Sequence, residues 1–278
     1  GRVGATPPRP GRRRWPRADA QAPSRPGLRL FDAFEPRLGP GVDRARGAMS
    51  AAAGEDALER RVAEICDELQ AACDELEDAH HEATLFMVGE EEGEEAAAHG
   101  GAAMLSPFLP TRPGDLVDFL RIGGVGASDV LLDIGCGDGR VALAVAAVRH
   151  CAVVGLDISK LCIDAARSAE AALTVKLGAD AFAAGVTWLH ADFLKEEVRA
   201  LESVRAATVL YLYVYPTLIE KLEPLVRDML LNDGFALARV VTVEYHLKTL
   251  PHAQEHHRLR LYDAASVAAE GKTEEGLD

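Results

Sequence analysis

The stretch Val130-Leu-Leu-Asp-Ile-Gly-Cys-Gly-Asp-Gly-Arg140 constrains the fold more than any other part of the chain. It begins with a short apolar run over 130–132, typical of a buried strand, and continues into the apolar run 140–148, typical of a buried helix. Between these runs, Gly135, Gly137 and Gly139 allow the backbone to approach a ligand closely, beside the free N–H groups that begin the helix. A strand, a glycine-spaced turn and a helix in this order predict a cofactor cradle.

Two carboxylates distinguish this turn from a dinucleotide-binding turn. Asp133 lies two residues before the first glycine, where it would repel a pyrophosphate, and Asp138 adds a second negative charge inside the turn. Such a turn suits a ligand that bears an ammonium and a sulfonium group. A tight turn that binds no ligand is the alternative interpretation.

Strand and helix patterns alternate after this turn. The expected strands are 151–157, 185–192, 207–214 and 235–244, and the expected helices are 161–173, 195–203 and 218–231. The alternation predicts an α/β fold with a doubly wound (Rossmann-like), mostly parallel sheet. A late strand over 258–262 is expected to pair antiparallel at the edge. Before the turn, Thr111 is the expected N-cap of a helix that runs to Arg121.

Acidic residues follow the next two predicted strands, at the edge where sheets of this kind bind ligands. Asp157 ends the second strand and can accept hydrogen bonds from a ribose diol. Asp192 ends the third strand beside Phe193, and this pair can take the amine and the face of an adenine. Each residue alone is commonplace at a strand end, but three such carboxylates on successive strands indicate a nucleoside-containing cofactor.

The stretch 130–140 resembles motif I of the class I methyltransferases that depend on S-adenosylmethionine (SAM), whose pattern is hydrophobic-x-D-x-G-x-G-x-G. Two more segments, Pro107-Phe-Leu-Pro-Thr111 and Tyr211-Leu-Tyr-Val-Tyr-Pro216, are similar to the protein-lysine methyltransferases that include the mitochondrial enzymes modifying the ATP synthase c subunit and the adenine nucleotide translocase. The resemblance covers about residues 104–263. Phe108 stands where that family usually shows Tyr, and Cys136 where it often shows Ser.

The resemblance implies SAM as the cofactor and a lysine of a basic protein segment as the substrate. The cofactor-binding residues that it implies are Asp133, Gly135, Gly137, Asp138, Gly139, Asp157, Asp192 and Phe193. The candidates for a water-poor aromatic pocket that accepts the lysine are Tyr211, Tyr213 and Tyr215. If the fourth strand runs that far, alternation aims all three rings the same way. Packing against helices is the alternative interpretation of the three tyrosines.

The charge of the chain is uneven. Residues 1–47 carry eleven arginines against four acidic side chains, whereas the remainder carries nineteen basic against forty acidic residues. So acidic a body disfavours a nucleic-acid partner, because affinity for phosphates comes from Lys and Arg. No apolar run approaches the roughly 18 residues that span a bilayer. The five cysteines show no paired spacing, which predicts reduced thiols in an intracellular protein, cytoplasmic or alternatively mitochondrial. No metal site is expected, since His256 and His257 stand alone in a polar stretch.

Outside the domain, the sequence predicts four accessory segments. Residues 1–48 form a disordered leader, either a transit peptide or upstream sequence translated by a gene-model error; the missing Met at position 1 favours the second. Residues 55–87 form a helix with an a/d heptad stripe, which either packs on the domain or makes a coiled-coil dimer. Residues 88–103 form an acidic linker and 264–278 a polar, frayed tail.

The sequence as a whole predicts a SAM-dependent methyltransferase that acts on a protein lysine. Two alternatives stay open: an enzyme that methylates nitrogen or oxygen of a small molecule, and a SAM-binding module that assembles partners without turnover.

Overall fold

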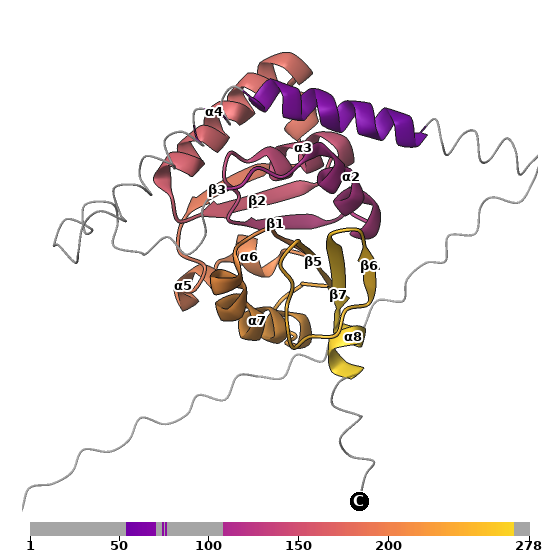
Figure 1. Ribbon diagram of the computed structural model, residues 1–278. Coiled ribbons are helices and arrows are strands. Elements are labelled where there is room, and N and C mark those ends of the chain that lie inside the picture. The colour runs from indigo at the N-terminus through magenta and orange to yellow at the C-terminus, as the bar shows by residue number, and fades with distance from the viewer. Residues whose placement is uncertain (1–53, 71–73, 75, 77–107, 270–278) are drawn as a thin grey trace, which may run out of the picture. The chain divides into compact units, whose positions relative to one another are not determined.

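The computed structural model describes residues 54–70, 74, 76 and 108–269 (Figure 1). They contain a seven-stranded sheet in the order β3-β2-β1-β4-β5-β7-β6. The strands are β1 (Val130–Ile134), β2 (Ala152–Asp157), β3 (Val186–His190), β4 (Val209–Leu212), β5 (Arg239–Val243), β6 (Gln254–His256) and β7 (Leu259–Asp263). The strands β1 to β5 run parallel, whereas β7 is antiparallel to both β5 and β6. The predicted doubly wound, mostly parallel sheet is therefore confirmed.

Helices cover both faces of the sheet. They are α2 (Pro113–Ile122), α3 (Arg140–Arg149), α4 (Lys160–Leu177), the 3-10 helix η2 (Ala179–Phe182), α5 (Glu196–Arg199), α6 (Glu202–Arg205), α7 (Pro216–Leu231) and α8 (Ala264–Ala268). In Figure 1, α2, α3 and α4 lie on one side of the sheet and α5, α6 and α7 on the other. Leu131 packs in the first core and its neighbour Leu132 in the second, because successive strand residues point to opposite faces.

The helix over residues 54–70 packs on the first of these cores. Its stripe residues Val62, Ile65 and Leu69 are at most 2% exposed and belong to the same buried cluster as α2 and α3. Two ion pairs flank them, Glu59 with Arg121 at 2.9 Å and Glu68 with Lys176. Side chains buried against their own domain are not available to a second copy, so packing, not a coiled-coil dimer, explains this part of the stripe. The predicted leader 1–48, the linker 88–103 and the end of the expected helix, 77–87, lie outside the described residues.

Two expectations about the helices differ in detail. Thr111 does not cap α2: Arg112 is the N-cap, with Pro113 behind it, and the Thr111 hydroxyl bonds to Tyr211 instead. The helix expected over 195–203 is two short helices, α5 and α6. In one continuous helix Val198 and Val204 would point about 120° apart, whereas the break lets both side chains be buried in one core.

At the C-terminal side, β6 lies outside β7 at the edge of the sheet, and its exposed Gln-Glu-His sequence lacks the apolar alternation that predicts a strand. The tail expected from residue 264 begins as helix α8. A capping box between Asp263 and Ser266 starts this helix, and Val267 is fully buried. Residues 270–278 lie outside the described part of the chain.

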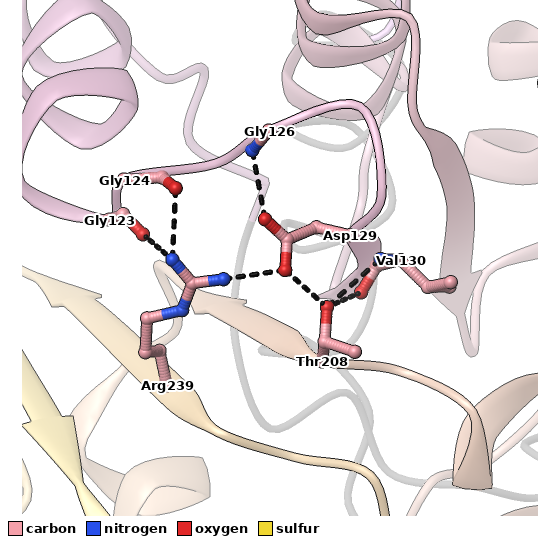
Figure 2. A network of polar contacts seen from close by, with 7 residues as sticks. All are labelled: Gly123, Gly124, Gly126, Asp129, Val130, Thr208 and Arg239. Carbon is pink, nitrogen blue, oxygen red and sulfur yellow. Dashed lines mark hydrogen bonds and ion pairs between the residues drawn. The ribbon is translucent and has the colours of Figure 1, made fainter. Parts of the chain in front are cut away.

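A polar network joins the amino ends of the central strands (Figure 2). Asp129, just before β1, accepts hydrogen bonds from the Gly126 N–H at 2.8 Å, from the Thr208 hydroxyl at 2.8 Å and from Arg239 at 2.5 Å. Arg239 also donates to the carbonyl oxygens of Gly123 and Gly124, both at 2.9 Å. Burial alone would raise the pKa of Asp129, but these donors outweigh it and hold the pKa below its usual value. The network fixes three strands at the sheet edge opposite the glycine turn.

Candidate functional site

The turn between β1 and α3 is fastened to the neighbouring strand. The N–H groups of Gly135 and Cys136 both donate to the carbonyl oxygen of Leu156, at 2.8 and 3.1 Å. Gly137 has a φ of +53°, and a Cβ atom there would lie 2.4 Å from the Phe108 ring. A side chain at this position would therefore require both a left-handed backbone and the removal of Phe108. The absence of a side chain at Gly137 thus lets the Phe108 ring pack directly on the turn.

Asp133 ends up buried without a complete set of partners. It is 2% exposed, and its Oδ2 atom has no hydrogen-bond partner among the described residues. Burial, with the charges of Asp157 and Asp138 nearby, raises the pKa of this carboxyl well above its usual value. An orphaned buried carboxylate oxygen is costly unless a ligand satisfies it. The site therefore fits a ligand that brings a cationic hydrogen-bond donor.

Asp157 holds the turn as well as the end of β2. Its Oδ2 accepts a hydrogen bond from the Gly137 N–H at 3.0 Å, and its Oδ1 accepts from the Ser159 N–H at 2.8 Å. These two hydrogen bonds fix the orientation of the carboxylate at the cleft. The three carboxylates expected to face one ligand do gather at one edge: Asp133, Asp157 and Asp192 line the same cleft.

Asp138 differs from the expectation of a free negative charge in the turn. It forms a buried ion pair with Arg140, at 2.7 Å between Oδ2 and Nη2, and Arg140 also donates to the Thr111 carbonyl oxygen at 3.3 Å. The guanidinium therefore neutralises this carboxylate and ties the segment before α2 to the turn. Arg140 was not predicted as a site residue, although a basic side chain two residues after Asp138 is a sequence signal for such an ion pair.

Asp192 and Phe193 lie just beyond β3, which ends at His190 and not at Asp192 as expected. The Asp192 Oδ1 accepts a hydrogen bond from the Leu194 N–H at 2.9 Å, which fixes the loop. Phe193 is 3% exposed, packs in the second core and contributes to the cleft wall. Trp188 was not predicted as a site residue. Its ring packs on Gly139 and Gly155, since Cβ atoms at these two glycines would lie only 2.6 and 2.3 Å from the ring.

The three tyrosines do not share one direction, because β4 ends at Leu212. Tyr211 is 1% exposed, and its hydroxyl lies 2.9 Å from that of Thr111. Burial raises the pKa of Tyr211 well above its usual value, so the hydroxyl stays protonated. Tyr213 lines the cleft and hydrogen-bonds Arg258, whereas Tyr215 is the N-cap of α7 and lies 5.4 Å from the Tyr245 ring. Tyr211 and Tyr213 thus border the cleft, and Tyr215 belongs to its surroundings.

The cleft lies at the carboxyl ends of β1, β2 and β4, where sheets of this kind bind ligands. One wall is the glycine turn, and the other is the segment 108–111 with Tyr213 and Leu218. Its charged lining residues are Asp133, Asp138, Asp157, Asp192 and Arg140. Burial raises the pKa of the Cys136 thiol in the same wall, which keeps it protonated.

Comparison with known proteins finds one matching family model. Residues 131–234 match the family model described as a methyltransferase domain. This part of the chain is similar to methyltransferase domains, a match that is consistent with SAM as the cofactor. No curated protein matches the sequence. Among the described residues, no helix has both the length and the apolar character needed to cross a membrane.

Several solved structures share the general arrangement. An RNA methyltransferase from Salinibacter ruber, in complex with S-adenosyl-L-homocysteine, is 21% identical over 56% of this chain and 94% of its own, with a TM-score of 0.45. The rRNA methyltransferase aviRa from Streptomyces viridochromogenes is 14% identical over 65% and 97%, with a TM-score of 0.44. Geranyl diphosphate C-methyltransferase from Streptomyces coelicolor is 21% identical over 47% and 48%, with a TM-score of 0.33. Similarities this low say nothing about the substrate of this chain.

Proposed function

We propose that the protein is a protein-lysine N-methyltransferase. The observation that carries this proposal is the negative charge of the cleft. Four carboxylates line it, and its one guanidinium is already paired with Asp138. Such a lining attracts cations and repels phosphodiesters. A lysine side chain is the common cationic nucleophile of proteins, and it suits this field better than a nucleic acid does.

The cofactor-binding roles are assigned from the unpaired oxygen of Asp133 and from the residues that line the cleft. When bound, SAM supplies an electrophilic methyl group on a sulfonium. We assign its ammonium group to the unpaired Oδ2 of Asp133, its ribose to Asp157, and its adenine to Asp192 and Phe193. The cation would give the buried Asp133 carboxylate the partner that it lacks, which is why its ionised form becomes favourable in the complex.

The acceptor amine must be neutral and held close to the methyl group, because the chemistry is an in-line displacement that the enzyme promotes mainly by positioning. We assign the acceptor to the wall formed by Pro110, Tyr213 and Leu218. Apolar and aromatic surface there disfavours the protonated amine, and so lowers the pKa of an entering lysine. Arg258 binds both Asp115, at 2.8 Å, and Tyr213, and this keeps the Tyr213 ring in place.

The decisive experiment transfers a labelled methyl group from SAM into a cell extract, followed by separate digestion with protease and with nuclease. Label that is lost only to protease, and recovered as methyl-lysine after hydrolysis, supports the proposal. Label in nucleic acid, or in metabolites that pass a size-exclusion column, contradicts the lysine assignment. No label, with SAM still bound, indicates a non-catalytic SAM-binding module.

Two variants make this experiment specific. Asp133→Asn should lower labelling at limiting SAM roughly 10- to 100-fold, whereas Arg239→Gln, at the opposite edge of the sheet, should retain it at temperatures where the variant is folded. Labelling that is undiminished in Asp133→Asn would come from a contaminating enzyme.

A further inference from the structure

Three potential metal ligands that the methyltransferase site does not use gather beside α2. The His257 Nδ1 atom lies 2.8 Å from Oδ2 of Asp118, and the His256 Nε2 atom lies 3.4 Å from Oδ1 of the same carboxylate. All three donor groups lie within 4.8 Å of one another, and none of the three residues lines the cleft. Within the described part of the chain, this is the one such cluster of His, Cys, Asp or Glu side chains.

The backbone brings the two imidazoles to the same side. Neighbouring residues of an extended strand normally point in opposite directions, but His257 has a φ of +51° and begins the two-residue turn between β6 and β7. The ring centroids consequently lie 4.0 Å apart. Such turns favour Gly, Asn or Asp at a position with positive φ, so a histidine here accepts backbone strain of the kind that accompanies functional sites.

We infer that Asp118, His256 and His257 bind one divalent cation of the zinc class. Two nitrogen or oxygen ligands about 2.1 Å from a tetrahedral ion lie about 3.4 Å apart, which is the separation found between His256 and Asp118. Two imidazoles and one carboxylate form a donor set that binds zinc in preference to calcium or magnesium. The imidazole side chains are 46% and 69% exposed, so an ion can reach them and water can complete the coordination.

One neighbouring cation competes with the ion. Arg121 lies 3.5 Å from the Oδ1 atom of Asp118, but it also forms a 2.9 Å hydrogen bond with Glu59 of the N-terminal helix. Because Glu59 offers the guanidinium a second partner, Arg121 can release Asp118 when the ion enters. The Asp118 side chain is 14% exposed, so it presents a partly desolvated charge that holds an ion more strongly than a fully hydrated one.

The ion would fasten α2 to the β6–β7 turn. Asp115, one turn earlier on α2, binds Arg258 at the end of the same turn, and Arg258 contacts Tyr213 in the cleft wall. A bound ion would therefore restrain α2 and the β6–β7 turn, which support this cleft wall, without contacting the residues of the wall. The role is structural, and no step of methyl transfer passes through the ion.

Calorimetric titration of the metal-free full-length protein with zinc chloride at pH 7.5 tests the inference. We expect one ion per chain, with affinity at least tenfold weaker in His257→Ala and in Asp118→Asn, which nearly preserves the size of the side chain. His252→Ala, a half-exposed histidine of the same region, should bind like the wild type. Circular dichroism verifies that each variant is folded.

The sequence holds a second pair of adjacent histidines, His80 and His81. Three results would overturn the inference: no binding, equal affinity in the wild type and both cluster variants, or binding that is lost only when His80 and His81 are both replaced by alanine. Hydrogen exchange provides a second readout that does not depend on activity. Zinc should slow amide exchange at least several-fold over 113–122 and 254–258 in the wild type but not in His257→Ala. Exchange that slows equally in both proteins would also contradict the site.

Discussion

Replacing Asp133 by asparagine should move cofactor affinity and stability in opposite directions. In the free protein, Asp133 is a buried carboxylate with an unpaired oxygen and two further carboxylates nearby. An unsatisfied buried polar group costs about 1–3 kcal/mol, and more when it is charged. The asparagine side chain retains the shape without the charge, so we expect the free energy of unfolding of the cofactor-free protein to rise by at least about 1 kcal/mol. At this chain length that corresponds to a melting temperature about 2–4 °C higher.

Affinity for SAM should fall in the same variant. A hydrogen bond to a charged group contributes about 1.5–3 kcal/mol, which corresponds to a dissociation constant roughly 10- to 100-fold larger. Calorimetry measures this constant, and differential scanning calorimetry of the cofactor-free protein measures the stability. A dissociation constant within twofold of the wild type, or a lower melting temperature at pH 7, would refute the reasoning.

The direction in which stability changes with pH gives a further test of the role of Asp133. Because the pKa of Asp133 is raised in the folded protein, the folded state holds this proton more tightly than the unfolded chain does. The resulting stabilisation is full below the ordinary pKa of 3.8 and is lost as the pH rises through the folded-state pKa. The stability advantage of Asp133→Asn should therefore grow from acid to neutral pH.

Asp129 provides the matched control. Asp129 is a partly buried aspartate just before β1, whereas Asp133 is fully buried within that strand; three donors satisfy Asp129 and hold its pKa low. The same change, Asp129→Asn, should lower the melting temperature and leave SAM affinity unchanged. If both variants moved stability in the same direction, the contrast between a paired and an unpaired carboxylate would be wrong.

Three other perturbations test separate parts of the structure. Arg239→Gln should cost about 2 kcal/mol at neutral pH; because the pKa of Asp129 is lowered, urea unfolding should find this loss present above about pH 4 and shrinking as the pH falls through the folded-state pKa. Tyr211→Phe removes a buried hydroxyl that pairs with Thr111, so it should lower stability by about 1–2 kcal/mol, while methyl transfer falls less than tenfold; a larger loss in single-turnover assays would assign chemistry to this hydroxyl. Ile65→Ala should cost about 2–5 kcal/mol, because it leaves a cavity in the domain core, and sedimentation should find the same oligomeric state as in the wild type; a change of state would restore the coiled-coil interpretation.

Local pattern was enough to predict the sheet and the cradle. The apolar runs of β1, β2, β4 and β5 and the intervening helices have the periods that burial on both faces demands, so their alternation specified the doubly wound topology. The glycine turn was predictable for a similar reason: Gly135, Gly137 and Gly139 all adopt positive φ, which other residues rarely accept. In the same way, the positions of Asp133, Asp157 and Asp192 follow from strand ends meeting at one edge.

Contacts between distant segments were decided only by the tertiary structure. The Thr111 hydroxyl could cap a helix or pair with Tyr211, one hundred residues away, and only packing selects the second. The heptad stripe of 55–87 was compatible with packing on a partner helix or on the chain's own core, since both bury the same side chains. Over residues 54–70, the core of the domain buries them. His256 and His257 looked solitary because Asp118 reaches them through folding alone. A residue's own period and conformational preference are local and can be derived from its neighbours in sequence, but its charge partner and the face that covers it depend on which segments the completed fold brings together.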